Sequence, residues 1–187
     1  MEAFLVSTGI VALAEIGDKT QLLALVLAAR YKRPLPIVLG ILFATLANHA
    51  LAAWLGAWIT NLTGRETMRW VLGASFLAMA AWSLVPDKLD EVEAKRARFG
   101  AFGATLVAFF LVEMGDKTQV ATVALAARYA SIAVVVAGTT LGMLLANVPA
   151  VVLGERLLRR VPVKTVRLAA AAVFAVLGAL ALADPKF

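Results

Sequence analysis

The seven residues 15–21, EIGDKTQ, reappear almost unchanged as residues 113–119, EMGDKTQ. Each copy lies inside an apolar stretch long enough to cross a bilayer, which takes roughly 20 residues. A charged side chain at the bilayer centre costs at least about 2.5–3.5 kcal/mol on insertion scales. Four acids and two lysines at that depth must therefore face a protein interior or a wet cavity, and they indicate a functional site.

The remaining composition supports a membrane protein. Hydrophobic residues make up 62% of the chain, whereas a soluble domain is about half apolar. Residues 35–59 and 130–153 contain no Asp, Glu, Lys or Arg. The pattern predicts six transmembrane helices, at about residues 3–29, 35–59, 68–85, 101–127, 131–153 and 166–183.

The net charge of +6 does not indicate nucleic-acid binding, because the basic residues lie at the ends of apolar runs. The chain has no cysteine and one histidine. This composition excludes disulfides, iron–sulfur clusters and thiolate metal sites, and it argues against a nitrogen-rich zinc or copper site.

The two halves of the chain are copies. A shift of 98 residues without a gap superimposes the two motifs, and it also places Gly40 on Gly138 and Arg69 on Arg167. The predicted domains are repeat 1 (residues 1–86), a charged linker (87–100) and repeat 2 (101–187). With three helices each, the repeats must insert in opposite directions. The predicted fold is an all-α membrane protein of six transmembrane helices, arranged as two inverted-topology three-helix repeats.

Twelve of the sixteen Lys and Arg residues outside the motifs flank the loops after the first, third and fifth predicted helices. The positive-inside rule places those loops in the cytoplasm. We therefore expect a cytoplasmic 87–100 linker and both termini on the outside.

The acids of each motif are spaced so that they can act together. Glu15 and Asp18 are three residues apart, and on a continuous helix they share one face with Lys19. Glu113 and Asp116 repeat this spacing. These four acids are the predicted metal ligands.

Glycine inside each motif predicts a break in the helix at Gly17 and Gly115, since glycine eases local unwinding. A break can turn Thr20, Gln21 and freed carbonyls toward the acids, as in the discontinuous helices of transporters. All these ligands are oxygen atoms, which suit hard divalent cations such as Ca²⁺, Mg²⁺ or Mn²⁺. The residues expected to support the site are Lys19, Thr20, Gln21, Lys117, Thr118 and Gln119.

The charges of the two motifs add to −2, from four carboxylates and two lysines. One divalent cation neutralises this cluster, and so do two protons. We therefore hypothesise that one cation and two protons compete for it, which gives electroneutral exchange.

A purely structural alternative pairs Glu15 with Lys19 and Glu113 with Lys117 within each helix, but it leaves both aspartates without partners. Asn48, His49 and Asn147 lie in the middle of the second and fifth predicted helices. We interpret them first as helix–helix contacts, with a proton relay or support of the metal ligands as the alternative.

The paired E-x-G-D-K-T segments resemble the transmembrane protein 165 family of cation/proton exchangers, and the similarity covers essentially the whole chain. The resemblance implies export of Mn²⁺, and in some members Ca²⁺, from the cytosol against protons. It also implies that Glu15, Asp18, Glu113 and Asp116 bind the ion. The short loops suggest a prokaryotic member in the cytoplasmic membrane.

We therefore predict a secondary active transporter and not an enzyme, with Mn²⁺ favoured as the exported ion. A divalent-cation channel and a membrane-embedded acid/base enzyme are the alternatives. The expected partners are a divalent cation, protons and the lipid bilayer, with no prosthetic group and no nucleic acid. The sequence leaves open whether the chain forms a homodimer.

Overall fold

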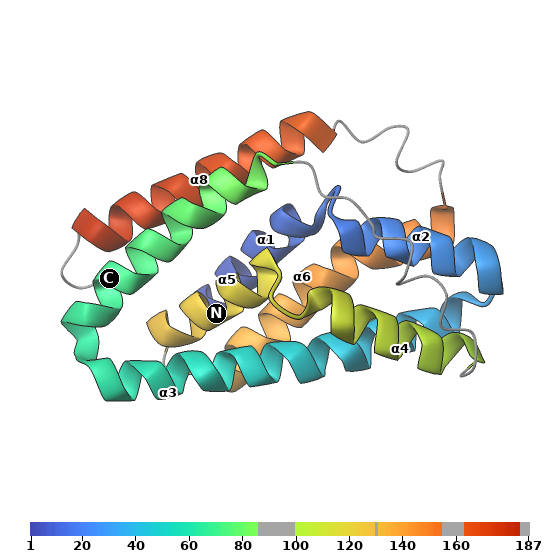
Figure 1. Ribbon diagram of the computed structural model, residues 1–187, viewed down its shortest axis with the longest axis horizontal. Helices are drawn as coiled ribbons and strands as arrows, with labels where there is room; N and C mark the ends of the chain where they lie inside the picture. The colour runs from blue at the N-terminus through green and yellow to red at the C-terminus, as the bar shows by residue number, and fades with distance from the viewer. Residues whose placement is uncertain (86–99, 130, 155–162, 184–187) are drawn as a thin grey trace.

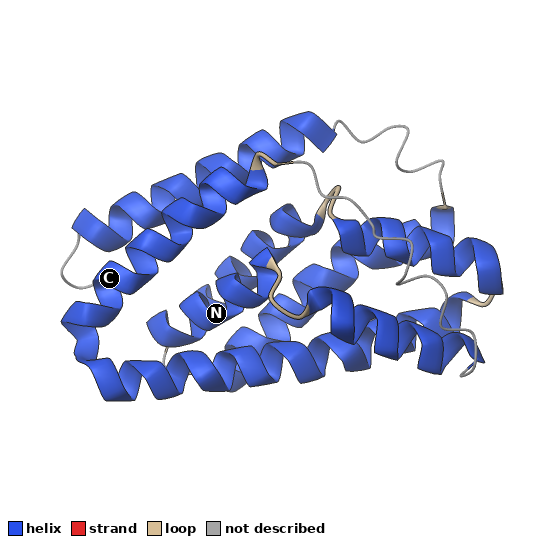
Figure 2. Cartoon of the chain, viewed as in Figure 1, coloured by secondary structure: helices blue, strands red, loops and turns tan. Residues whose placement is uncertain are grey.

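The computed structural model describes residues 1–85, 100–129, 131–154 and 163–183, and within them it contains helices and no strand (Figures 1 and 2). The 87–100 linker lies outside the described residues except for Gly100, which begins a helix. The described helices are α1 (Glu2–Glu15), α2 (Lys19–Tyr31), α3 (Pro34–Ser83), α4 (Gly100–Glu113), α5 (Lys117–Arg128), α6 (Ile132–Leu153) and α8 (Val163–Ala183).

The helices divide the chain differently from the six predicted spans. The first predicted span forms two helices, α1 and α2, and the fourth forms α4 and α5. The second and third are joined in α3, which changes direction at Gly64 (φ 77°, ψ 165°). Among the described residues, three helices are long and apolar enough to cross a membrane alone: Pro34–Gly64, Ile132–Leu153 and Lys164–Ala183.

The breaks between paired helices fall at the motif glycines. Gly17 has φ 82° and Gly115 has φ 79°, a left-handed conformation that glycine adopts without steric cost. Asp18 and Asp116 follow in extended conformation and occupy the N-cap positions of α2 and α5. Glu15 and Asp18 therefore lie on different helices, and the expectation that they share one face of a continuous helix is wrong.

Small residues let the helices of the two halves pack closely. A Cβ atom on Gly40 would lie 2.7 Å from the Thr105 Cβ, and one on Gly138 would lie 2.7 Å from the Phe4 carbonyl oxygen and 2.9 Å from the Ser7 Cβ. These contacts hold α3 against α4 and α1 against α6. Figure 1 shows α8 beside the second half of α3, where Phe76 and Phe174 stack with ring centroids 6.3 Å apart.

The α1–α6 packing predicts opposite effects for two glycine substitutions. A Cβ on Gly142 of α6 would lie 2.6 Å from the Thr8 carbonyl oxygen, so Gly142→Ala should destabilise the protein by about 1–3 kcal/mol. Gly9 of α1 has open space around it, and Gly9→Ala should be neutral or stabilising by up to about 1 kcal/mol. Unfolding midpoints in detergent measure both, and equal shifts for the two variants would contradict the packing.

Candidate cation site

Three buried acids converge where the two helix breaks meet. Glu15 ends α1, Glu113 ends α4 and Asp116 begins the turn into α5. One carboxylate oxygen from each lies within 4.8 Å of the others. All three residues are at most 1% exposed. These three of the four predicted metal ligands form one cluster, and the fourth, Asp18, lies outside it.

The motif threonines fold back across each break to their glutamates. The Thr20 hydroxyl donates a hydrogen bond to Glu15 Oε2, and the Thr118 hydroxyl donates to Glu113 Oε1. Asn147 Nδ2 also donates to Glu15 Oε2, at 3.2 Å. The second oxygen of each glutamate is buried and has no hydrogen-bond partner among the described residues. Each glutamate therefore keeps one oxygen available for a proton or a cation.

The lysines form ion pairs between the two halves. Lys19 Nζ lies 3.2 Å from Asp116 Oδ1, and Lys117 Nζ pairs with Asp18 Oδ1. The structural alternative, in which each lysine pairs with the glutamate four residues earlier, is therefore wrong. The Lys117 side chain is 3% exposed and the Lys19 side chain is 24% exposed, so the two pairs differ in their access to the surroundings.

The motif glutamines hold the two breaks. Gln21 Oε1 accepts a hydrogen bond from the Gly17 amide at 3.0 Å, and Gln119 Oε1 accepts one from the Gly115 amide at 2.7 Å. Gln21 Nε2 donates to the Ala146 carbonyl at 2.9 Å. The amide oxygen of each glutamine is thus engaged at the backbone, and neither glutamine lies in the acidic cluster.

The three polar residues in the middle of α3 and α6 have different surroundings. Asn48 Nδ2 donates to the Phe110 carbonyl at 2.9 Å, a helix–helix contact. Asn147 reaches Glu15, as described above. His49, which the 98-residue shift aligns with Asn147, is fully buried, and neither of its nitrogens has a hydrogen-bond partner among the described residues.

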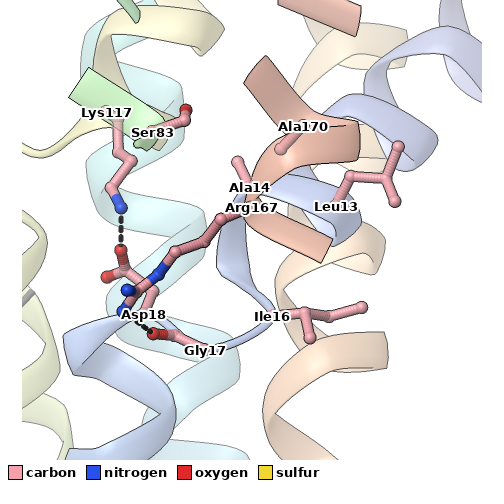
Figure 3. Close-up of a pocket in the computed structure, with 9 residues that line it drawn as sticks. All are labelled: Leu13, Ala14, Ile16, Gly17, Asp18, Ser83, Lys117, Arg167 and Ala170. Atoms are coloured by element: carbon pink, nitrogen blue, oxygen red, sulfur yellow. Dashed lines mark hydrogen bonds and ion pairs between the residues drawn. The ribbon is translucent and has the colours of Figure 1, made fainter. Parts of the chain in front are cut away.

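Sequence reasoning missed one residue near the site. Arg167 of α8 donates from Nη2 to the Gly17 carbonyl at 3.3 Å. Figure 3 shows this side chain beside the Asp18–Lys117 pair, in a pocket too narrow to admit a water molecule. The match of Arg167 with Arg69 in the repeat was the available signal.

The cluster has the chemistry and the size to hold a hard divalent cation. Its ligands are carboxylate oxygens, which such ions prefer. Oxygens bound on opposite sides of a Ca²⁺ ion at 2.3–2.6 Å lie about 4.6–5.2 Å apart. The three acid oxygens all lie within 4.8 Å of one another, which is close enough for one cation to contact all three.

The buried pair predicts strong coupling between its two members. Lys117→Met leaves the Asp18 carboxylate without its lysine partner and should cost about 3–5 kcal/mol. Adding Asp18→Asn removes that charge and should restore part of the loss, so the double variant should be more stable than the sum of the single variants by more than about 1 kcal/mol. Lys19→Met, at the more exposed pair, should cost less. Thermal unfolding in detergent measures all four variants, and additive losses would contradict the pairing.

Comparisons with known proteins identify the family. A family model described as "Divalent cation/proton antiporter GDT1" matches residues 3–91 and 101–186. A Vibrio cholerae protein named "Putative manganese exporter" is 52% identical over 175 residues, which cover 93% of this chain and 87% of that protein. GDT1-like protein 5 of Arabidopsis thaliana is 30% identical over 223 residues, which cover 99% and 97%.

No solved structure matches the chain. The family model matches both halves and covers each of the twin motifs. The resemblance to the transmembrane protein 165 family is confirmed, and the enzyme alternative is excluded. This multi-pass membrane protein therefore belongs to the GDT1 family of divalent cation/proton antiporters.

Proposed function

We propose that this antiporter exports Mn²⁺ from the cytosol and admits protons in exchange, at a site built by Glu15, Glu113 and Asp116. The observation that carries the proposal is the pair of buried glutamates, each with one oxygen that lacks a hydrogen-bond partner among the described residues. A buried anionic oxygen without a partner is costly. A bound cation or a proton removes that cost, so the two alternate there.

The ion pairs support assigning the exchange to the glutamates. Lys117 neutralises Asp18 and Lys19 neutralises Asp116. Among the motif residues, the remaining charge of −2 belongs to Glu15 and Glu113. Two protons cancel it when both glutamates are protonated, and one Mn²⁺ cancels it when both are ionised. The proposed cycle therefore moves one divalent cation for two protons without net charge.

Mn²⁺ is the proposed cargo because the Vibrio cholerae relative is named as a manganese exporter. The oxygen ligands also suit Ca²⁺, so Ca²⁺ is the second ion to test.

The proposed membrane arrangement has six spans in two inverted repeats, with both termini outside and the 87–100 linker in the cytoplasm. At a rise of 1.5 Å per residue, α1 and α2 together extend about 40 Å, and so do α4 and α5. Each broken pair can thus cross a hydrocarbon core of about 30 Å. A bacterial relative supports placement in the cell membrane. A homodimer stays a prediction.

Asn147 and His49 are proposed to support the two glutamates from α6 and α3. Asn147 binds Glu15, and the repeat relation puts His49 in the corresponding place for Glu113. Asn48 is proposed to stay a helix–helix contact, since its amide nitrogen bonds the Phe110 carbonyl.

Transport in liposomes tests the proposed cargo and coupling. Purified protein is reconstituted with a trapped Mn²⁺- or Ca²⁺-sensitive dye, and a pH gradient is imposed. Wild type should show cation uptake driven by the gradient. Glu15→Gln and Glu113→Gln should each lower the rate at least about 100-fold, because each removes one ionisable ligand and one proton carrier.

Glu2→Gln is the matched control, since Glu2 is an exposed acid whose carboxylate bonds Tyr129, away from the breaks. It should transport at the wild-type rate. Cation flux that ignores the pH gradient would favour the channel. Absence of flux for every divalent cation tested would remove the proposal.

The charge balance makes a separate prediction about voltage. If two protons exchange for one Mn²⁺, potassium diffusion potentials of either sign should change the initial rate by less than about two-fold. A cycle that moves one net charge across the whole membrane gains about 2.3 kcal/mol per 100 mV. A strong dependence on voltage would therefore contradict the two-for-one exchange.

A further inference from the structure

The two helix breaks differ in what covers them. At the first break, Ile16 and Gly17 are half-buried, and the Arg167 guanidinium from α8 donates to the Gly17 carbonyl. At the second break, Met114 is 54% exposed, and Gly115 is also exposed. Identical motif chemistry therefore has two different environments in one structure.

Arg69 is the repeat counterpart of Arg167, and it makes a different contact. Its Nη2 atom lies 2.7 Å from Glu66 Oε1, three residues earlier on the same helix. Within the described part of the chain, no hydrogen bond joins Arg69 to Gly115. The position that matches Glu66 in the second repeat holds Lys164, which repels a guanidinium and cannot hold Arg167 in the same way.

The hydrogen bond from Arg167 to the Gly17 carbonyl stabilises the first break. The left-handed turn takes the Gly17 carbonyl out of the helical hydrogen-bond ladder, so this group needs another donor. A guanidinium supplies a charge-assisted hydrogen bond, which is stronger than a neutral one. The Glu66–Arg69 pair is different, because the Glu66 side chain is 71% exposed and surface pairs of this kind are weak. Breaking the ion pair with Glu66 therefore costs little, although the Arg69 side chain is only 15% exposed and its guanidinium also lies 5.3 Å from the centroid of the Trp70 ring.

We propose that Arg167 and Arg69 are positioning residues that make alternating contacts with the two helix breaks during transport. In the state described here, Arg167 binds the Gly17 carbonyl and covers the first break. In the opposite state, Arg69 leaves Glu66, binds the Gly115 carbonyl and covers the second break, while Arg167 releases Gly17. The inference rests on the proposed exchange function and adds that the site opens to each side of the membrane in turn. Two related repeats can adopt each other's conformation at similar energy, which allows such an alternation.

Hydrogen exchange followed by mass spectrometry tests the alternation in detergent, where no transport is needed. In wild type, the peptide covering residues 113–119 should exchange faster than the one covering 15–21. Arg167→Gln should speed exchange in 15–21 by about ten-fold and slow it in 113–119, because the described state loses a hydrogen bond to a charged group. Arg69→Gln should have the reverse effect, with slower exchange in 15–21 and faster exchange in 113–119. The exchange rates of Arg167→Lys should lie between those of wild type and those of Arg167→Gln.

Glu66→Gln is a surface variant that keeps the test independent of folding defects. It frees Arg69 and should shift both peptides in the same directions as Arg167→Gln, by about two- to five-fold. If Arg167→Gln changes only the 15–21 peptide, its role is local packing and the proposal is overturned. Unchanged exchange in both peptides for Arg167→Gln and Glu66→Gln overturns it as well.

Transport kinetics supply a second readout. Neither arginine lies among the acids of the cation cluster, so Arg167→Gln should lower the maximal rate several-fold and leave the half-saturating Mn²⁺ concentration within about two-fold of wild type. If Arg167→Gln instead raised the half-saturating Mn²⁺ concentration several-fold and left the maximal rate unchanged, this result would contradict a role in alternation. If the wild-type protein transported no cation, the proposed function would be refuted. The hydrogen-exchange data would still decide whether the two arginine contacts alternate.

Discussion

The arrangement of this protein depends on how six ionisable groups are neutralised inside an apolar helix bundle. Four carboxylates and two lysines lie in segments that are otherwise hydrophobic. The structure neutralises two of the carboxylates by ion pairs that connect the halves, Lys19 with Asp116 and Lys117 with Asp18. Each half thus supplies the counter-charge of the other. Among the described residues neither glutamate forms an ion pair with a lysine, and this difference separates the residues that hold the fold from those proposed to exchange ions.

The helix break makes that division of roles possible. On a continuous helix, the lysine would lie one turn beyond the glutamate of its own motif. The left-handed glycine instead redirects the chain, so that the aspartate caps a new helix and the threonine hydroxyl returns to the glutamate. The N-terminal ends of α2 and α5 carry partial positive charge, which favours the two aspartates that begin them. The break therefore costs regular hydrogen bonds and gains a polar centre in which each group has a defined partner.

Much of this could be predicted from the sequence. The twin motif, the apolar runs and the 98-residue shift predicted a helical membrane protein with breaks at Gly17 and Gly115 and with acids at its centre. The partners of Lys19 and Lys117 could not be predicted, because pairing across the halves depends on how two distant segments pack and not on spacing along one helix. The role of Gln21 at the break was hidden for another reason, since its hydrogen bond from the Gly17 amide depends on the local geometry of the left-handed turn. Arg167 carried only a weak signal, since it lies far from the motif and only its match with Arg69 in the repeat marked it.

The ion pairs between the halves have a consequence for any shorter version of this chain. A chain containing residues 1–86 alone keeps Asp18 and Lys19 but loses the residues that neutralise them. Such a fragment can recover both pairs by associating with another copy of itself, since the second motif has the same residues at these positions. The ion pairs between the halves are thus contacts that two separate half-length chains would have to make with each other. The joined chain keeps the two halves together in a ratio of one to one, whereas separate chains have to meet in the membrane first.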